Sequence, residues 1–138
     1  MKGRKPKLKV IEGGKPAGAC PAPPAWLSAP AKAEWKRAAQ QLHDRGLLAD
    51  DTLATLESYC IAVGTVRDCE RIMAREGRIV AGKDGPKPHP AFKMQAAAMR
   101  EARLLASELG LTPHRRGAGA TGDDRRSEAW GEDDDLLA

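Results

Sequence analysis

Apolar residues recur at helical spacing in three stretches of this chain, and glycine and proline separate the stretches. The first stretch begins after Ser28, which can cap a helix, and Pro30 stands in the first turn, where a missing N–H costs nothing. The spacing predicts an amphipathic helix whose apolar stripe consists of Ala31, Trp35, Ala38, Ala39 and Leu42. Glu34 and Arg37 lie elsewhere around this helix, and Gly46 ends it.

The second stretch is long and predicts a helix over roughly Thr52–Glu76. Asp50 or Asp51 can cap its N-terminus, Gly77 ends it, and Gly64 interrupts it where another helix can approach closely. Its apolar stripe comprises Leu53, Leu56, Cys60, Val63, Val66 and Met73. Such a helix is about 35 Å long. This is more than a small monomer needs, so we expect part of it to pack on a neighbouring subunit.

A small hairpin is predicted between the second and third stretches. Ile79-Val80 is a strand candidate, and Lys83-Asp84-Gly85 is a turn signal. The prolines of Pro86–Pro90 keep the returning strand at a sheet edge.

The third stretch predicts a helix over roughly Ala91–Leu109, which Pro90 opens. Its inner face is expected to consist of Phe92, Ala96, Met99, Ala102, Leu105 and Leu109. Gly110 caps the C-terminus, and Pro113 prevents continuation.

These elements predict a mainly α fold, in which a three-helix core has a long central helix and a small β-hairpin before the third helix. The length of 138 residues indicates one domain with tails. Residues 1–25 are rich in lysine, proline and glycine and form a disordered arm, and residues 113–138 form a disordered acidic tail. Residues 26–112 are then the helical core through which the chain oligomerises. No apolar run has the length of a membrane helix, and no secretory signal is evident.

Charge is segregated along the chain. Residues 1–16 hold six basic residues and one acidic residue, whereas residues 123–138 hold seven acidic residues and two arginines. A flexible basic arm suits the phosphates of a polyanion. The predicted DNA contacts are Lys2, Arg4, Lys5, Lys7 and Lys9, with Arg115 and Arg116 after the third helix.

The acidic tail also carries large apolar side chains, which favours docking in the groove of a partner protein. The docking candidates are Trp130, Asp133, Asp134, Asp135, Leu136 and Leu137. The alternative is that the tail is only a solvated segment that keeps the protein soluble.

Residues that could carry chemistry do not form a site in the sequence. The three histidines stand in different segments, and the three cysteines lie at no metal spacing and are expected to be reduced. Cys60 and Cys69 are expected in the core, and no phosphate-binding loop of the Walker type is present. We therefore expect no catalytic site, no metal and no cofactor.

Several short motifs occur in an order and spacing that resemble the small subunit of phage terminase, in the group common in siphophages and prophages. They are Gly3-Arg4-Lys5-Pro6, Pro23-Pro24-Ala25-Trp26-Leu27, Ala33-Glu34-Trp35, Gly46-Leu47-Leu48 with Asp51, Tyr59-Cys60, Pro88-His89-Pro90-Ala91, and Leu109-Gly110-Leu111-Thr112-Pro113 followed by Arg116. The resemblance covers roughly Gly3–Arg116. It departs from the family at His114 and Arg115, where small polar residues are usual.

The resemblance implies a non-catalytic subunit that recognises DNA for viral genome packaging. Such subunits form homo-oligomeric rings, here expected to hold about eight to ten chains. They bind double-stranded viral DNA at the packaging start site and deliver it to the large subunit, which holds the ATPase and nuclease. The implied location is the cytoplasm of the bacterial host. The acidic tail lies outside the resemblance, so its assignment to large-subunit docking depends on its charge.

Other function classes remain open. A small helix-turn-helix transcriptional regulator is the main alternative, although the second helix is long for a recognition helix and carries Glu57, Asp68 and Glu70. A small nuclease requires clustered ligands that the sequence lacks. A scaffold that never contacts DNA predicts no salt-dependent DNA binding.

Overall fold

The computed structural model describes residues 18–113. The order of its elements is α1 (Ala29–Asp44), α2 (Asp50–Glu76), β1 (Ile79–Gly82), β2 (Gly85–Pro88) and α3 (Pro90–Glu108). The predicted mainly α fold is confirmed, with its long central helix and its hairpin before the third helix. Of the arm predicted over residues 1–25, the part up to Ala17 lies outside the described residues, as does the predicted tail from His114. Residues 18–25 are described and contact α1, where the Pro21 carbonyl accepts from Trp35 Nε1 at 3.0 Å.

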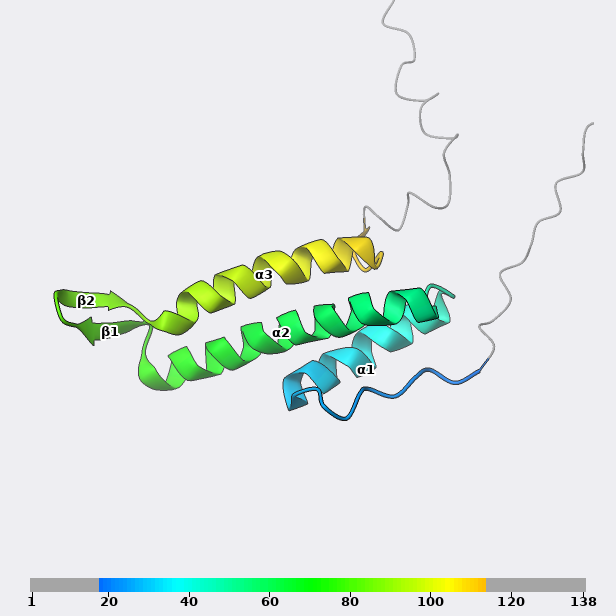
Figure 1. The fold of residues 1–138 in the computed structure, drawn as a ribbon, viewed down its shortest axis with the longest axis horizontal. Coiled ribbons are helices and arrows are strands. Elements are labelled where there is room, and N and C mark those ends of the chain that lie inside the picture. Colours follow the sequence, from blue (N-terminus) through cyan, green and yellow to red (C-terminus); the bar gives the residue numbers. More distant parts are fainter. Residues whose placement is uncertain (1–17, 114–138) are drawn as a thin grey trace, which may run out of the picture.

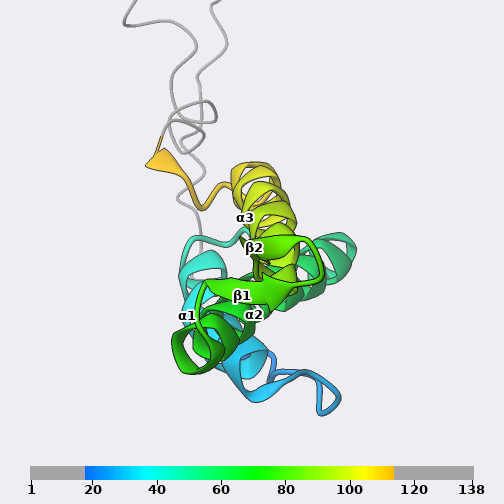
Figure 2. The same ribbon diagram turned by 90° about the vertical axis from the view of Figure 1, so that its left-hand side faces the viewer.

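The long helix α2 is the centre of the fold. The shorter α1 packs along the N-terminal half of α2, and α3 runs along the length of α2 on another side (Figure 1). The hairpin of β1 and β2 projects from the end where α2 stops and α3 starts. It stands in front of the helices when the molecule is viewed from that end (Figure 2). Beyond Asp68, α2 has α3 beside it but not α1.

The limits of α1 follow the predicted signals. Ser28 is its N-cap, and the N–H of Ala31 donates to Ser28 Oγ at 3.4 Å. Gly46, two residues past the helix, adopts a φ of +67°, which glycine tolerates without strain. All five residues of the predicted apolar stripe are buried.

The start of α2 differs from the prediction. Asp50 and Asp51 do not cap the helix but lie in its first turn. Their negative charges are stabilised there by the positive end of the helix dipole. The N-cap position is Ala49, which has no side-chain donor or acceptor. The side chain of Thr52 provides the hydrogen bond at this helix start instead, because its Oγ1 accepts from the backbone N–H of Ala49 at 2.9 Å. The prediction that an aspartate caps α2 is therefore wrong.

Two faces of α2 are buried. Leu56 and Cys60 join the α1 stripe in the main core, while Cys69 and Met73 form a second cluster with Ala91 of α3. The other members of the predicted stripe, Leu53, Val63 and Val66, are half-buried. A helix flanked on two sides needs a wider apolar surface than one stripe.

The inner face predicted for α3 is partly wrong. Phe92 and Met99 are 49% and 50% exposed, whereas Ala91 and Gln95 are buried. Gln95 is held by α2, since its amide donates to Glu70 Oε2 at 2.8 Å. Over this segment α3 packs on α2 alone, so its contact is narrow and the large apolar side chains at its edges stay in solvent. The end of α3 is as predicted, with Gly110 at a φ of +73° and the Leu111 N–H donating to the Ala106 carbonyl.

Candidate assembly surface

The residues predicted to contact DNA and the large subunit all lie outside the part of the chain that the structure describes. The DNA contacts Lys2, Arg4, Lys5, Lys7, Lys9, Arg115 and Arg116, and the docking residues Trp130, Asp133, Asp134, Asp135, Leu136 and Leu137, lie outside residues 18–113. What the structure does describe is the core that presents both ends of the chain and the surfaces this core exposes.

A buried carboxylate fastens α1 to α2. Glu34 is only 2% exposed and accepts hydrogen bonds from side chains on both helices. Arg37 donates through its guanidinium, with Nε 3.0 Å from Oε1, and the Tyr59 hydroxyl donates to the same oxygen at 2.9 Å. Arg67 donates to Oε2 at 3.1 Å. The negative charge of Glu34 is thus matched by two guanidinium groups.

Burial and hydrogen bonding around Glu34 shift the pKa values of Glu34 itself, Tyr59 and Cys60. Burial alone would raise the pKa of Glu34, but the hydrogen bonds from Arg37 and Tyr59 outweigh it and hold that pKa below its usual value. Burial, with the hydrogen bond to Glu34, raises the pKa of Tyr59 to about 12. Burial and the Glu34 charge likewise raise the pKa of Cys60 to about 12. Cys60 is therefore a protonated core thiol at neutral pH, not a nucleophile.

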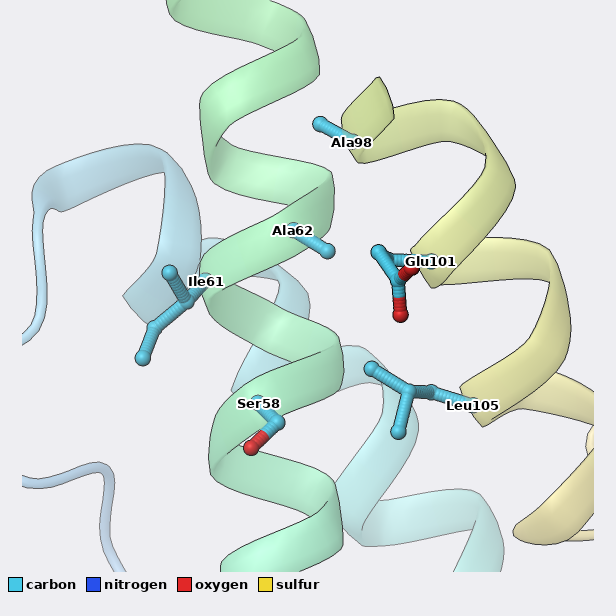
Figure 3. Close-up of a pocket in the computed structure, with 6 residues that line it drawn as sticks. All are labelled: Ser58, Ile61, Ala62, Ala98, Glu101 and Leu105. Atoms are coloured by element: carbon cyan, nitrogen blue, oxygen red, sulfur yellow. The ribbon is translucent and has the colours of Figure 1, made fainter. Parts of the chain in front are cut away.

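Two shallow grooves flank the middle of α2. The first, of about 330 Å³, lies between α2 and α3 and is lined by Ala62, Ala98, Leu105 and Glu101 among others. Figure 3 shows the side chains of Ala62, Glu101 and Leu105 converging between the two helices, while Ile61 points away from α3.

The second groove, of about 310 Å³, lies between α2 and the start of α1. Trp26 and Asp68 line it, and Ile61 lines both grooves. Trp26 is 65% exposed and Ile61 is 43% exposed. We call the two grooves with Ile61 between them the groove face. Large apolar side chains exposed together indicate a contact surface.

His89 joins the base of the hairpin to α2 and α3 through hydrogen bonds. The His89 N–H donates to the Arg78 carbonyl at 2.8 Å, and His89 Nδ1 accepts from the Ala91 N–H at 3.0 Å, which caps α3. Since Nδ1 accepts, the proton of the neutral ring is on Nε2, which lies 2.9 Å from Glu76 Oε2. The hydrogen bond from His89 lowers the pKa of Glu76, with a further contribution from Arg75. One histidine thus ties the ends of α2 and α3 to the hairpin.

The described core is close to electrically neutral. It holds thirteen lysine and arginine residues and eleven aspartate and glutamate residues. The arginines along the second half of α2 and just after it are each paired with a carboxylate: Arg67 with Glu34, Arg71 with Asp68, Arg75 with Glu76 and Arg78 with Glu70. These pairs leave little unbalanced positive charge along that side.

The described residues contain no group of three or more His, Cys, Asp or Glu side chains placed to hold a metal ion. Within the same residues, no helix is both long and apolar enough to span a bilayer.

A family model for the small subunit of phage terminase matches residues 31–125. The chain belongs to this family. The match takes in nearly all of α1, the whole of α2, the hairpin and α3, and it continues past the described residues. Comparison with curated proteins and with solved structures gives no match.

Membership of the terminase small subunit family confirms the resemblance drawn from the motifs and associates the chain with phage genome packaging. Small subunits of this family are in general the non-catalytic partners of terminase, and the family implies DNA and the large subunit as partners.

Sequence reasoning missed two features of this terminase subunit. Glu34 was placed away from the buried stripe, although it lies three residues after Ala31 and four before Ala38, both of which are buried. The groove face was also missed, because it joins residues from three separate segments.

Proposed function

We propose that this chain is the DNA-recognition subunit of a phage packaging terminase. It assembles through residues 26–112 into a closed ring in the cytoplasm of the bacterial host. It binds double-stranded viral DNA at the packaging start site, then delivers this DNA to the large subunit and regulates it. It has no catalytic role of its own.

The observation that carries the DNA-binding part is the separation of charge between the core and the arm. The core has a surplus of only two positive charges, whereas residues 1–17 hold six basic residues and one acidic residue. Affinity for a duplex comes chiefly from cations that displace counterions from phosphates. The arm residues from Lys2 to Lys9 are therefore the stronger candidates, and Arg115 and Arg116 add to them.

The assembly part is supported by the apolar side chains that the single chain leaves exposed. Ile79 and Met94 are 70% and 61% exposed, in addition to the groove face. A cluster of exposed apolar side chains such as the groove face is typical of a protein contact. A closed ring of identical chains covers it on every copy at once.

DNA binding is tested by neutralising the arm. In a full-length variant with Lys2, Arg4, Lys5, Lys7 and Lys9 changed to Gln, we expect a weaker gel shift of viral DNA. We also expect a shallower dependence of affinity on salt, by about 0.9 in the slope for each phosphate that the arm no longer neutralises. The matched control neutralises five exposed cations of the core: Lys36, Arg45, Lys93, Arg100 and Arg103. Equal losses of affinity in the two variants would refute the role of the arm.

The native mass of the purified chain separates the ring from the regulator. Light scattering is expected to give a mass of about eight to ten chains. A mass of one or two chains would instead support the helix-turn-helix regulator.

The role of the acidic tail is tested by a truncation that ends at Gly122. This variant is expected to keep its native mass and its DNA affinity but to lose binding to the large subunit, because Trp130, Leu136 and Leu137 are removed with the acidic residues around them. Co-purification of the two subunits measures this. Undiminished binding by the truncated chain would show that the tail is not the docking segment.

A further inference from the structure

The hairpin exposes an apolar face. In its register Ile79 is opposite Pro88 and Ala81 is opposite Pro86. Alternate residues of a strand point to the same side, so these four side chains share one face of the hairpin. All four are exposed, and Ile79 is 70% exposed. We call this set the hairpin ridge.

The hairpin ridge cannot reach the groove face of its own chain. Ile61 and the end of α2 at Glu76 are fifteen residues apart, which is about 22 Å along a helix. The hairpin projects beyond that end, away from the middle of α2 (Figure 1). Each chain therefore leaves both a projecting apolar element and an apolar groove open to solvent.

The charges beside the two surfaces differ in sign. The hairpin carries two exposed lysines, Lys83 in its turn and Lys87 on the face opposite the ridge, against one aspartate, Asp84. The first groove carries Glu101, whereas Asp68 of the second groove is paired with Arg71. The acidic tail is a poor occupant of the groove face, because residues 123–138 carry seven acidic residues against two arginines. The hairpin of a second copy matches the groove face both in apolar character and in charge.

We infer that the hairpin ridge of one copy packs on the groove face of the next copy, with Lys83, in the hairpin turn, near Glu101. The inference rests on the proposed ring. Because the two surfaces are different, the contact is head-to-tail, which produces a closed ring when the rotation between copies closes. A contact between two like surfaces would stop at a dimer.

A mixing experiment tests this contact directly. Full-length Ile79→Asp has a disabled ridge and an intact groove, and full-length Ile61→Asp has the reverse. Each variant alone is expected to be a single chain by light scattering. A mixture of the two is expected to give a heterodimer and nothing larger. The intact ridge of the Ile61→Asp chain packs on the intact groove face of the Ile79→Asp chain, and the two surfaces that remain are both disrupted.

Leu104→Asp is the control, because Leu104 is 57% exposed but belongs to neither surface. It is expected to keep the full native mass, and circular dichroism of all three variants is expected to match the unmodified chain. Single variants of full mass, a mixture that stays as single chains, or a Leu104→Asp variant that dissociates would each overturn the contact.

A charge exchange gives a second test. Lys83→Glu alone, or Glu101→Lys alone, is expected to lower the native mass at low salt. Both changes in one chain are expected to restore it. If the double variant stays dissociated, the contact is wrong. The mass of the unmodified chain reports separately on the ring, so failure of this contact and failure of the proposed function give different results.

Discussion

Replacing Glu34 with glutamine is expected to lower the free energy of unfolding by about 2 kcal/mol, which is the range for an unmet buried polar group. The carboxylate now accepts from Arg37, Tyr59 and Arg67, and glutamine replaces one accepting oxygen with a donating NH₂ group. A donor then faces a donor at a site that is 2% exposed. Urea unfolding followed by circular dichroism measures the change.

Glu108→Gln is the matched control for this substitution. Glu108 is exposed at the end of α3, so the same chemical change is expected to alter stability by less than about 0.5 kcal/mol. Equal effects at the two positions would mean that the buried carboxylate has no special role in joining α1 to α2.

The difference between the unmodified chain and Glu34→Gln is expected to depend on pH. The folded pKa of Glu34 is lower than its unfolded value, so the folded state favours the ionised form. The stabilisation is therefore present above the unfolded pKa, which is about 4.3. It is lost as pH falls through the folded pKa. Urea unfolding at pH 7 and at successively lower pH should show the gap between the two proteins narrowing only on the acid side. A gap that stays constant down to pH 3 would contradict this.

The ends of the helices could be predicted because their signals are local. Ser28, Gly77 and Gly110 mark helix ends in the sequence and in the structure, and the observed start of α2 is two residues earlier than predicted. Capping hydrogen bonds and positive φ angles involve residues within a few positions of each other. The aspartates before α2 show the limit of this reasoning, because several adjacent polar residues can each satisfy a helix start.

The packing of α3 could not be predicted from its period alone. Phe92 and Met99 repeat at helical spacing with residues that do face α2, and the sequence pattern does not show how wide the contact is. The width depends on whether one helix or two lie against α3, and this is a property of the tertiary arrangement. Phe92 and Met99 lie at the edges of this contact and stay exposed.

The partners of Glu34 were hidden for a related reason. Arg37 is within one turn of the same helix, but Tyr59 and Arg67 are 25 and 33 residues away and come together with Glu34 only when α2 has a particular rotation against α1. No spacing rule links positions on two helices before their packing is known. The groove face joins three segments in the same way, so its residues could be identified only from the structure.

Replacing Gly64 with leucine is expected to destabilise the fold by about 3 kcal/mol, at the upper end of the usual cost of overpacking. A Cβ atom at Gly64 would lie 3.1 Å from both the Cβ and the backbone nitrogen of Ala31, so even a methyl group is tight here. The branched side chain of leucine has no space unless α1 moves away from α2. Urea unfolding compares this variant with Ala74→Leu, an exposed change on the same helix that is expected to be nearly neutral.

The same substitution connects the stability of the core with assembly. Ala31 and Trp26 form one wall of the groove next to Ile61, and displacing α1 moves this wall. Gly64→Leu is therefore expected to reduce the native mass even under conditions where its helical content persists, whereas Ala74→Leu is expected to leave the mass unchanged. A Gly64→Leu chain with the full native mass would show that assembly does not require α1 to pack closely on α2.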